Sequence, residues 1–93
     1  MYHLKVLTPE EVIFEGEVSA LIAPGSMGYL GVLSNHAPLV TSLKKGFLII
    51  TDKNKAKHYY EVSGGFLEVS HNEAFLLADS VQESAPVNIG GGI

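Results

Sequence analysis

The chain has no cysteine and no arginine, and each absence excludes a class of site. Without cysteine it can form neither disulfides nor thiolate metal sites. Its six basic residues are all lysines, and the net charge is −4 at pH 7. The lysines form no basic stripe interleaved with aromatic residues, so nucleic-acid binding through phosphate neutralisation is disfavoured.

Long apolar runs are also missing. No segment approaches the ~18 consecutive apolar residues that are needed to cross a bilayer. Residues 1–5 do not form the charged region, followed by an apolar one, that begins a signal peptide. We therefore expect neither export by a visible signal nor a membrane-spanning segment. A chain of 93 residues is expected to form one domain around one core.

Turn-forming residues recur at short intervals, for example at positions 24–28, 34–38 and 52–54, and no long helical periodicity lies between them. This spacing is typical of an all-β sandwich or barrel. We predict an all-β fold, a two-sheet antiparallel β-sandwich of about ten short strands over residues 1–83. Residues 84–93, which include three consecutive glycines, are predicted to form a flexible tail.

Alternation of apolar and polar residues indicates strands with one solvated face. One such strand begins the chain, with Tyr2, Leu4 and Val6 alternating with His3 and Lys5. A second covers residues 14–22; its apolar face is predicted to carry Phe14, Gly16, Val18, Ala20 and Ile22, and its polar face Glu15, Glu17 and Ser19.

The alternation changes parity across Gly64-Gly65, from Tyr60 and Val62 before the glycines to Leu67 and Val69 after them. An inserted residue or a sharp bend in a strand would produce this change. We interpret the glycine pair as a bulge or a sandwich corner.

Two segments, residues 47–50 and 74–78, are apolar on both faces of any strand they form. Such a strand must be covered on both sides. Either both are central strands shielded by loops, or the second face is an interface with a partner. The sequence leaves these two explanations open.

No group of residues has the spacing of a catalytic or metal site. His36, His58, His71 and Asp79 could in principle bind a metal or move protons, but no His-x-His or His-x-x-x-His pair occurs. The glycines at positions 25–31 are followed by no Lys-Ser/Thr pair, so they lack the cation of a phosphate-binding loop. We expect no catalytic residue, no metal and no cofactor.

The same glycines indicate a shaped loop, because glycine permits backbone conformations and close approaches that other residues do not. Met27, Tyr29 and Leu30 are apolar or amphipathic residues at its expected tip. We expect these side chains to be exposed there, since burial against the domain's own core would be hard to arrange. A binding surface at this loop is the functional interpretation.

Several motifs together carry a family resemblance. They are Thr8-Pro9-Glu10, the segment from Phe14 to Val18, the segment from Pro24 to Leu39 with its Asn35-His36-Ala37-Pro38 turn, the segment from Val62 to Val69, and Leu77-Ala78-Asp79. In these residues the chain resembles the N-terminal β-sandwich domain of the epsilon subunit of F-type ATP synthase. The resemblance extends from about Tyr2 to Asp79.

The resemblance implies a non-catalytic rotor subunit of the central stalk, placed between the gamma subunit and the ring of c subunits. Such a subunit passes ion-driven rotation of the c-ring to gamma and touches no reacting phosphate. It implies a peripheral location on the cytoplasmic face of the bacterial inner membrane, with membrane association only through the complex.

The resemblance also implies contact residues for both partners. The predicted c-ring contacts are Ser26, Met27, Gly28, Tyr29, Leu30 and His36. The predicted gamma-subunit contacts are Thr8, Thr41, Phe47, Ser63 and Leu76.

The chain departs from typical family members because residue 93 leaves no room for the C-terminal helical hairpin. From this we expect no ATP site and no autoinhibition through that hairpin. An alternative function is a free-standing β-sandwich module that binds a small molecule at the loop of residues 25–38. A small hydrolase using His36 and Asp79 is a third interpretation.

Overall fold

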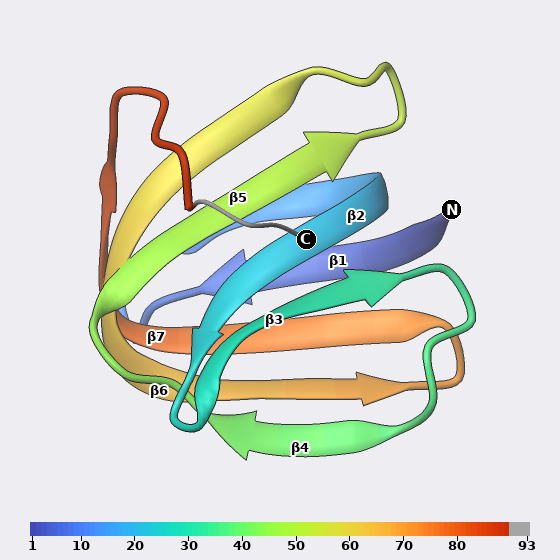
Figure 1. Ribbon diagram of the computed structural model, residues 1–93, viewed down its shortest axis with the longest axis horizontal. Helices are drawn as coiled ribbons and strands as arrows, with labels where there is room; N and C mark the ends of the chain where they lie inside the picture. Colours follow the sequence, from blue (N-terminus) through green and yellow to red (C-terminus); the bar gives the residue numbers. More distant parts are fainter. Residues whose placement is uncertain (90–93) are drawn as a thin grey trace.

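The computed structural model describes residues 1–89. Within them the chain forms seven β-strands and no helix (Figure 1). The strands are β1 (Tyr2–Leu7), β2 (Val12–Gly25), β3 (Gly28–Leu33), β4 (Leu39–Ser42), β5 (Gly46–Asp52), β6 (Lys57–Ser70) and β7 (Glu73–Glu83). The all-β prediction is confirmed, and no helix among the described residues could cross a membrane.

The strands form one barrel-like sheet in the order β1-β7-β6-β5-β2-β3, and β1 also pairs with β2, which closes the ring. Strand β4 lies off this path and pairs with β6. The prediction of two sheets with about ten short strands is not confirmed, because β2 and β6 are each 14 residues long and continue through places where the sequence indicated a break. Figure 1 shows these long strands curving around the molecule.

The interior face of β2 changes part-way along the strand. Val18 is fully buried, as predicted, but the next buried positions are Leu21 and Ala23 rather than Ala20 and Ile22. The pairing of β2 with β5 shifts register between Val18 and Ala20. A bulge of this kind moves the following side chains to the opposite face, so the predicted single apolar face was wrong beyond Val18.

At Gly64-Gly65 the structure has a corner within a continuous strand. Both glycines have positive φ, 64° and 116°, yet the register with β7 is the same before them, at Ser63↔Ser80, and after them, at Gly65↔Ala78. No residue is therefore inserted between β6 and β7. Of the two interpretations that the sequence allowed, the corner is the one observed.

Strand β1 has the predicted alternation. Tyr2, Leu4 and Val6 are buried, with 2%, 0% and 0% of their surface exposed. The Tyr2 hydroxyl donates a hydrogen bond of 2.7 Å to the carbonyl of Val32, which joins β1 to β3. Burial raises the pKa of this phenol well above its usual range, so it remains a donor at physiological pH.

The two segments that are apolar on both faces differ in how they are covered. In β5, Leu48 and Ile50 are fully buried in the core, and Ile49, on the other face, is only 7% exposed. In β7, Ala74, Leu76 and Ala78 are buried, whereas Phe75 and Leu77 are half-buried. The outer face of β5 is thus largely covered at Ile49, while the outer face of β7 remains partly accessible.

The turn between β5 and β6 is organised by Asp52. Its Oδ1 accepts hydrogen bonds from the backbone N–H groups of Asn54 and Ala56, at 2.8 and 3.0 Å. Its Oδ2 lies 2.9 Å from Nε2 of His58. These hydrogen bonds, that of His58 foremost, hold the pKa of Asp52 below its usual range.

We expect Asp52 to make folding sensitive to acid. A carboxyl group whose pKa is lowered by folding stabilises the protein fully above its unfolded pKa, about 4, and loses this contribution as pH falls through the lower folded pKa. The Asp52→Asn variant should therefore lose less stability than the parent between pH 4 and pH 2. Urea midpoints across this range test the expectation, with Asp79→Asn as the control; equal acid sensitivity in Asp52→Asn and the parent would contradict it.

Strand β7 ends at Glu83, and the first residues of the predicted tail contact the domain. Ser84 donates its backbone N–H to the carbonyl of Tyr59, at 3.0 Å, and Val87 and Ile89 are half-buried. The part of the predicted tail at 90–93 lies outside the described residues. A flexible tail remains a prediction.

Candidate interaction surface

The described residues contain no group of three His, Asp or Glu side chains that could hold a metal ion. The feature that the sequence predicted as functional is an interaction surface. Its centre is the β2–β3 turn at residues 25–28, where Gly25 pairs with Gly28. Met27, at the tip, is 98% exposed, and Ser26 is exposed beside it. The predicted exposure of Met27 is confirmed.

Tyr29 and Leu30 are not exposed at the tip, so this part of the prediction was wrong. Both belong to β3 and are half-buried, and Leu30 packs against the hydrophobic core. The Tyr29 hydroxyl accepts a hydrogen bond of 3.0 Å from the backbone N–H of Phe47. Residues 25–38 are thus a hairpin turn, a strand and a second turn, and the strand directs these two side chains back onto the domain.

Backbone hydrogen bonds fasten the hairpin to the link between β4 and β5. Ser26 donates to the carbonyl of Ser42, and Lys44 donates to that of Pro24, both at 2.9 Å. Leu43 donates to the carbonyl of Gly65 at the same distance. We call the region formed by residues 25–28, 43–46 and 63–65 the corner end; it lies at the lower left of Figure 1.

Gly46, at the corner end, is a position that no sequence motif indicated. A Cβ atom at this position would lie 2.7 Å from Cβ of Pro24 and 2.8 Å from the Tyr29 hydroxyl. Gly46 therefore leaves the space in which Tyr29 reaches the backbone of Phe47. The pairing of β2 with β3 sets Tyr29 beside Pro24, and the hydrogen bond from Lys44 to Pro24 brings the start of β5 to them; no local pattern in the sequence indicates this arrangement.

Three of the predicted gamma contacts also lie at or beside the corner end. Thr41 is half-buried on β4, and Phe47 is half-buried on β5 next to Gly46. Ser63 lies within the corner itself, where its hydroxyl is 2.6 Å from that of Ser80. The structure thus gathers these residues around the same region as the Met27 turn.

Thr8 and Leu76, also predicted as gamma contacts, are buried. The Thr8 hydroxyl accepts hydrogen bonds from the backbone N–H groups of Glu10 and Glu11, both at 3.3 Å, so it shapes the β1–β2 turn. Leu76 is 0% exposed and pairs with Leu67 inside the core. The prediction that Leu76 is a surface contact was wrong, because β7 turns this position inward.

His36 lies away from the other predicted c-ring contacts. It belongs to the turn at the far end of β3, and the six-residue strand separates the two turns by roughly 17 Å at the usual rise per residue. Neighbouring Asn35 donates its backbone N–H to Oδ1 of Asn72, at 2.7 Å. The Asn72 amide in turn donates to the carbonyl of Met1, at 2.9 Å. The structure therefore does not bring His36 together with Met27.

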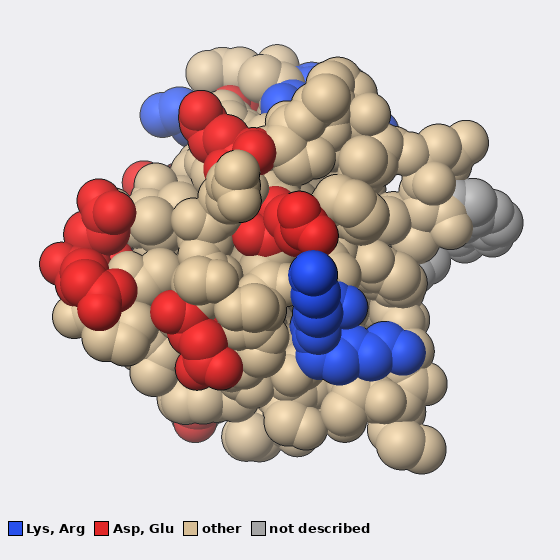
Figure 2. Space-filling view, turned by 90° about the vertical axis from the view of Figure 1, so that its left-hand side faces the viewer, with Lys and Arg blue, Asp and Glu red and all other residues tan. Residues whose placement is uncertain are grey.

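The charges near the corner end are mixed. Figure 2, which faces the left-hand side of Figure 1, shows acidic groups spread over this side of the molecule and lysines gathered in separate places. One shallow hollow of about 200 Å³ is lined by Lys45, Glu61, Val62, Ser63, Ser80 and Gln82. This lining is polar, unlike the mainly apolar pocket of a typical small-molecule site.

Comparison with known proteins identifies the family. Residues 1–84 match the family described as the ATP synthase, Delta/Epsilon chain, beta-sandwich domain. The chain is 40% identical over 87 residues to the ATP synthase epsilon chain of Moorella thermoacetica, covering 94% of this chain and 65% of that one. It is 39% identical over 80 residues to the epsilon chain of Chlorobium limicola, covering 86% of this chain and 91% of that one.

A solved structure agrees with this result. A chain of the Euglena gracilis mitochondrial ATP synthase, in a cryo-EM structure of OSCP, F1 and the c-ring, superposes with a TM-score of 0.81 at 27% identity, covering 86% of this chain and 51% of that one. The chain thus spans about two thirds of the Moorella relative's length and half of the Euglena chain. By sequence and by fold, this chain belongs to the β-sandwich domain family of the ATP synthase delta and epsilon chains.

Proposed function

We propose that this chain is a non-catalytic rotor subunit in the central stalk of an F-type ATP synthase, where it links the gamma subunit to the c-ring. The observation that carries the proposal is the family match over residues 1–84. The likeness to a chain within an assembly that includes the c-ring supports it. Rotation driven by ion flow would pass through this chain, which would contribute binding energy and stiffness rather than chemistry.

The proposed c-ring contact is the exposed β2–β3 turn, with Ser26, Met27 and Gly28 at its tip. Tyr29 and Leu30 would support this tip from behind, because one is hydrogen-bonded to β5 and the other packs on the core. His36 would meet a different part of the assembly. Backbone hydrogen bonds already hold this turn in place, which suits it to transmit force. Little binding free energy would therefore be spent on ordering the turn when it binds.

The proposed gamma contact includes Thr41, Phe47 and Ser63, around the corner end. Thr8 would act indirectly by shaping the β1–β2 turn. Through these partners the chain would be a peripheral part of the F1 sector, at the cytoplasmic face of a bacterial inner membrane. The proposed role needs no cofactor.

We expect Met27→Asp to weaken binding to the c-ring by about tenfold, equivalent to ~1.4 kcal/mol, because it places a charge where an apolar side chain would be buried. The fold should be retained, since Met27 is 98% exposed. The measurement is affinity of the chain for purified c-ring bound to gamma, with the melting temperature as the check on folding.

Asn54→Asp, at the exposed β5–β6 turn, provides the matched control, because it adds the same charge far from the β2–β3 turn. It should leave affinity unchanged. Equal affinities for Met27→Asp and the parent would remove the β2–β3 turn from the proposed contact.

A further inference from the structure

A row of apolar side chains crosses the outer surface of four neighbouring strands. It runs from Phe66 on β6 to Leu77 on β7, then to Leu7 on β1 and Val12 on β2, each residue paired in register with the next. Phe66 is 37% exposed and Val12 is 52% exposed. The structure therefore presents a continuous apolar row to solvent.

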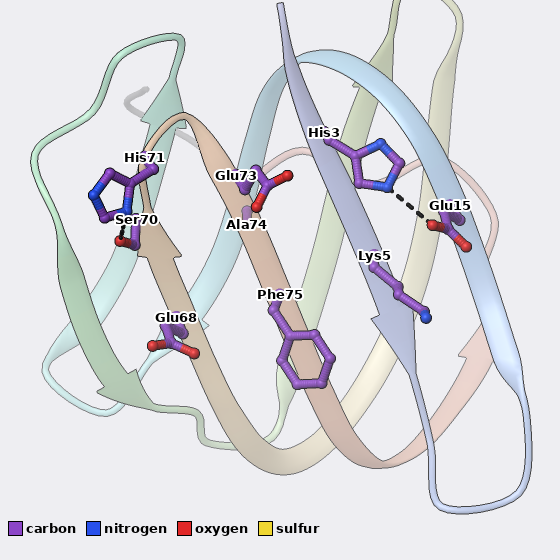
Figure 3. A pocket seen from close by; sticks show the side chains of 9 residues that line it. All are labelled: His3, Lys5, Glu15, Glu68, Ser70, His71, Glu73, Ala74 and Phe75. Carbon is purple, nitrogen blue, oxygen red and sulfur yellow. Dashed lines mark hydrogen bonds and ion pairs between the residues drawn. The ribbon is translucent and has the colours of Figure 1, made fainter.

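A second row lies beside the first, two residues away along β6, β7 and β1 and three residues away along β2, where the pairing with β1 shifts register. It consists of Glu68, Phe75, Lys5 and Glu15, again paired in register. The next row includes Glu73 and His3. Together these side chains line a shallow hollow of about 340 Å³ (Figure 3). The outer face is thus amphipathic, apolar along one side and mainly acidic along the other.

In the β6–β7 half of this hollow, His71 lies beside Glu68 and Glu73 in the lining, where its Nδ1 is 2.7 Å from the Ser70 hydroxyl. On the β1–β2 side, His3 lies 3.0 Å from a carboxylate oxygen of Glu15, and Lys5 pairs in register with Glu15. No ion pair within residues 1–89 involves Glu68 or Glu73. In Figure 3 Glu68 lies to one side of Phe75, Lys5 lies to the other, and Glu73 lies further along β7, next to Ala74. A cation placed over that ring would have the Glu68 carboxylate beside it.

We propose that this outer face of β1, β6 and β7 docks a basic amphipathic helix of a partner polypeptide. The apolar side of such a helix would lie on Phe66 and Leu77. Lysine or arginine side chains on its other side would reach Glu68 and Glu73. A cation that lies over the Phe75 ring would add a cation–π contact to this attraction. Charge complementarity is the reason for choosing a basic partner segment.

The dimensions of the face fit this occupant. Neighbouring strands are ~4.8 Å apart, so a row across four strands is about 14 Å long and matches roughly ten helical residues at 1.5 Å each. The apolar and acidic rows are about 7 Å apart, within the ~10 Å width of a helix. The predicted c-ring and gamma contacts lie in neither row, so this surface is additional to the proposed stalk contacts and does not depend on them.

The probe is a helix-forming peptide of about 18 residues, long enough to be helical, with leucines on one side and lysines on the other. The full 93-residue chain is titrated with it, and backbone amide shifts are followed by NMR. Shifts confined to β6, β7, β1 and the start of β2, where Val12 lies, are expected. A peptide with glutamate in place of lysine should bind at least about tenfold more weakly, a difference of ~1.4 kcal/mol.

The double variant Glu68→Gln/Glu73→Gln is expected to bind the lysine peptide about fivefold to tenfold more weakly, through loss of two charge contacts. The control, Glu61→Gln/Glu83→Gln, removes the same charge from the part of β6 and β7 beyond the Gly64-Gly65 corner and should bind like the parent. Phe66→Ser tests the apolar row separately. Equal losses in both double variants, shifts spread over the surface, absence of binding, or concentration-dependent self-association through this face would each overturn the proposal.

Discussion

Replacing Gly65 with alanine is expected to lower the free energy of unfolding by about 3–5 kcal/mol, because strain and overpacking act together. The new Cβ atom would overlap the carbonyl oxygen of Leu77 and would lie 2.8 Å from Cα of Ala78. These are backbone atoms, so a change of side-chain rotamer cannot relieve the clash. The φ angle of 116° is also one that residues with a Cβ rarely adopt.

Gly64→Ala is the matched control. Its φ of 64° lies in the left-handed region, which costs a non-glycine residue about 1–2 kcal/mol. Its Cβ would meet Oδ2 of Asp79 at 2.5 Å, but this is the end of an exposed side chain that can move away. Urea denaturation of both variants measures the difference. If Gly65→Ala cost no more than Gly64→Ala, the close approach of β6 and β7 at the corner would be wrong.

Leu76→Ala is expected to lower the free energy of unfolding by about 2–5 kcal/mol, the usual range for removing a fully buried leucine side chain. Leu76 is 0% exposed and packs in the core. Its neighbour Leu77 lies on the outer face and is only half-buried, so Leu77→Ala should cost about 1 kcal/mol. Thermal and urea unfolding of the two variants give the comparison.

The variants Leu76→Ala and Leu77→Ala also test whether Leu76 is a core position or a contact with gamma. The family resemblance assigned Leu76 to the gamma contact, whereas the structure places it inside. If Leu76→Ala left stability unchanged but weakened binding to gamma, the inward orientation of Leu76 would be contradicted. Loss of stability in Leu76→Ala, with little loss in Leu77→Ala, agrees with the structure.

Features encoded by neighbouring residues were predictable from the sequence. The alternation in β1 places Tyr2 and Val6 in the core. The polar turn at residues 52–54 does join two strands. The exposed Met27 follows from two glycines that close a tight turn around it. In each case the determining interactions lie within a few residues of the chain.

Features set by distant residues were not predictable in this way. The bulge after Val18 appears only in the pairing of β2 with β5. Tyr29 is half-buried because the backbone of Phe47 offers its hydroxyl a hydrogen-bond donor, and that donor is 18 residues away along the chain. The location of His36 depends on the length of β3, and we had predicted the residues of β3 to be part of a loop. Alternation along the sequence indicates a strand, but it does not show with which strand it pairs, and that pairing determines which side chains point inward.

The most direct test of the proposed stalk role is titration of this chain with the gamma subunit of the same organism, by calorimetry and size-exclusion chromatography. We expect a one-to-one complex that Phe47→Glu and Ser63→Arg weaken while circular dichroism shows the fold retained. Asn54→Asp, at the β5–β6 turn, should bind like the parent. A binding free energy of ~7 kcal/mol would be detected at tens of micromolar. Absence of binding at these concentrations would contradict the proposed role, and only the family fold would then remain.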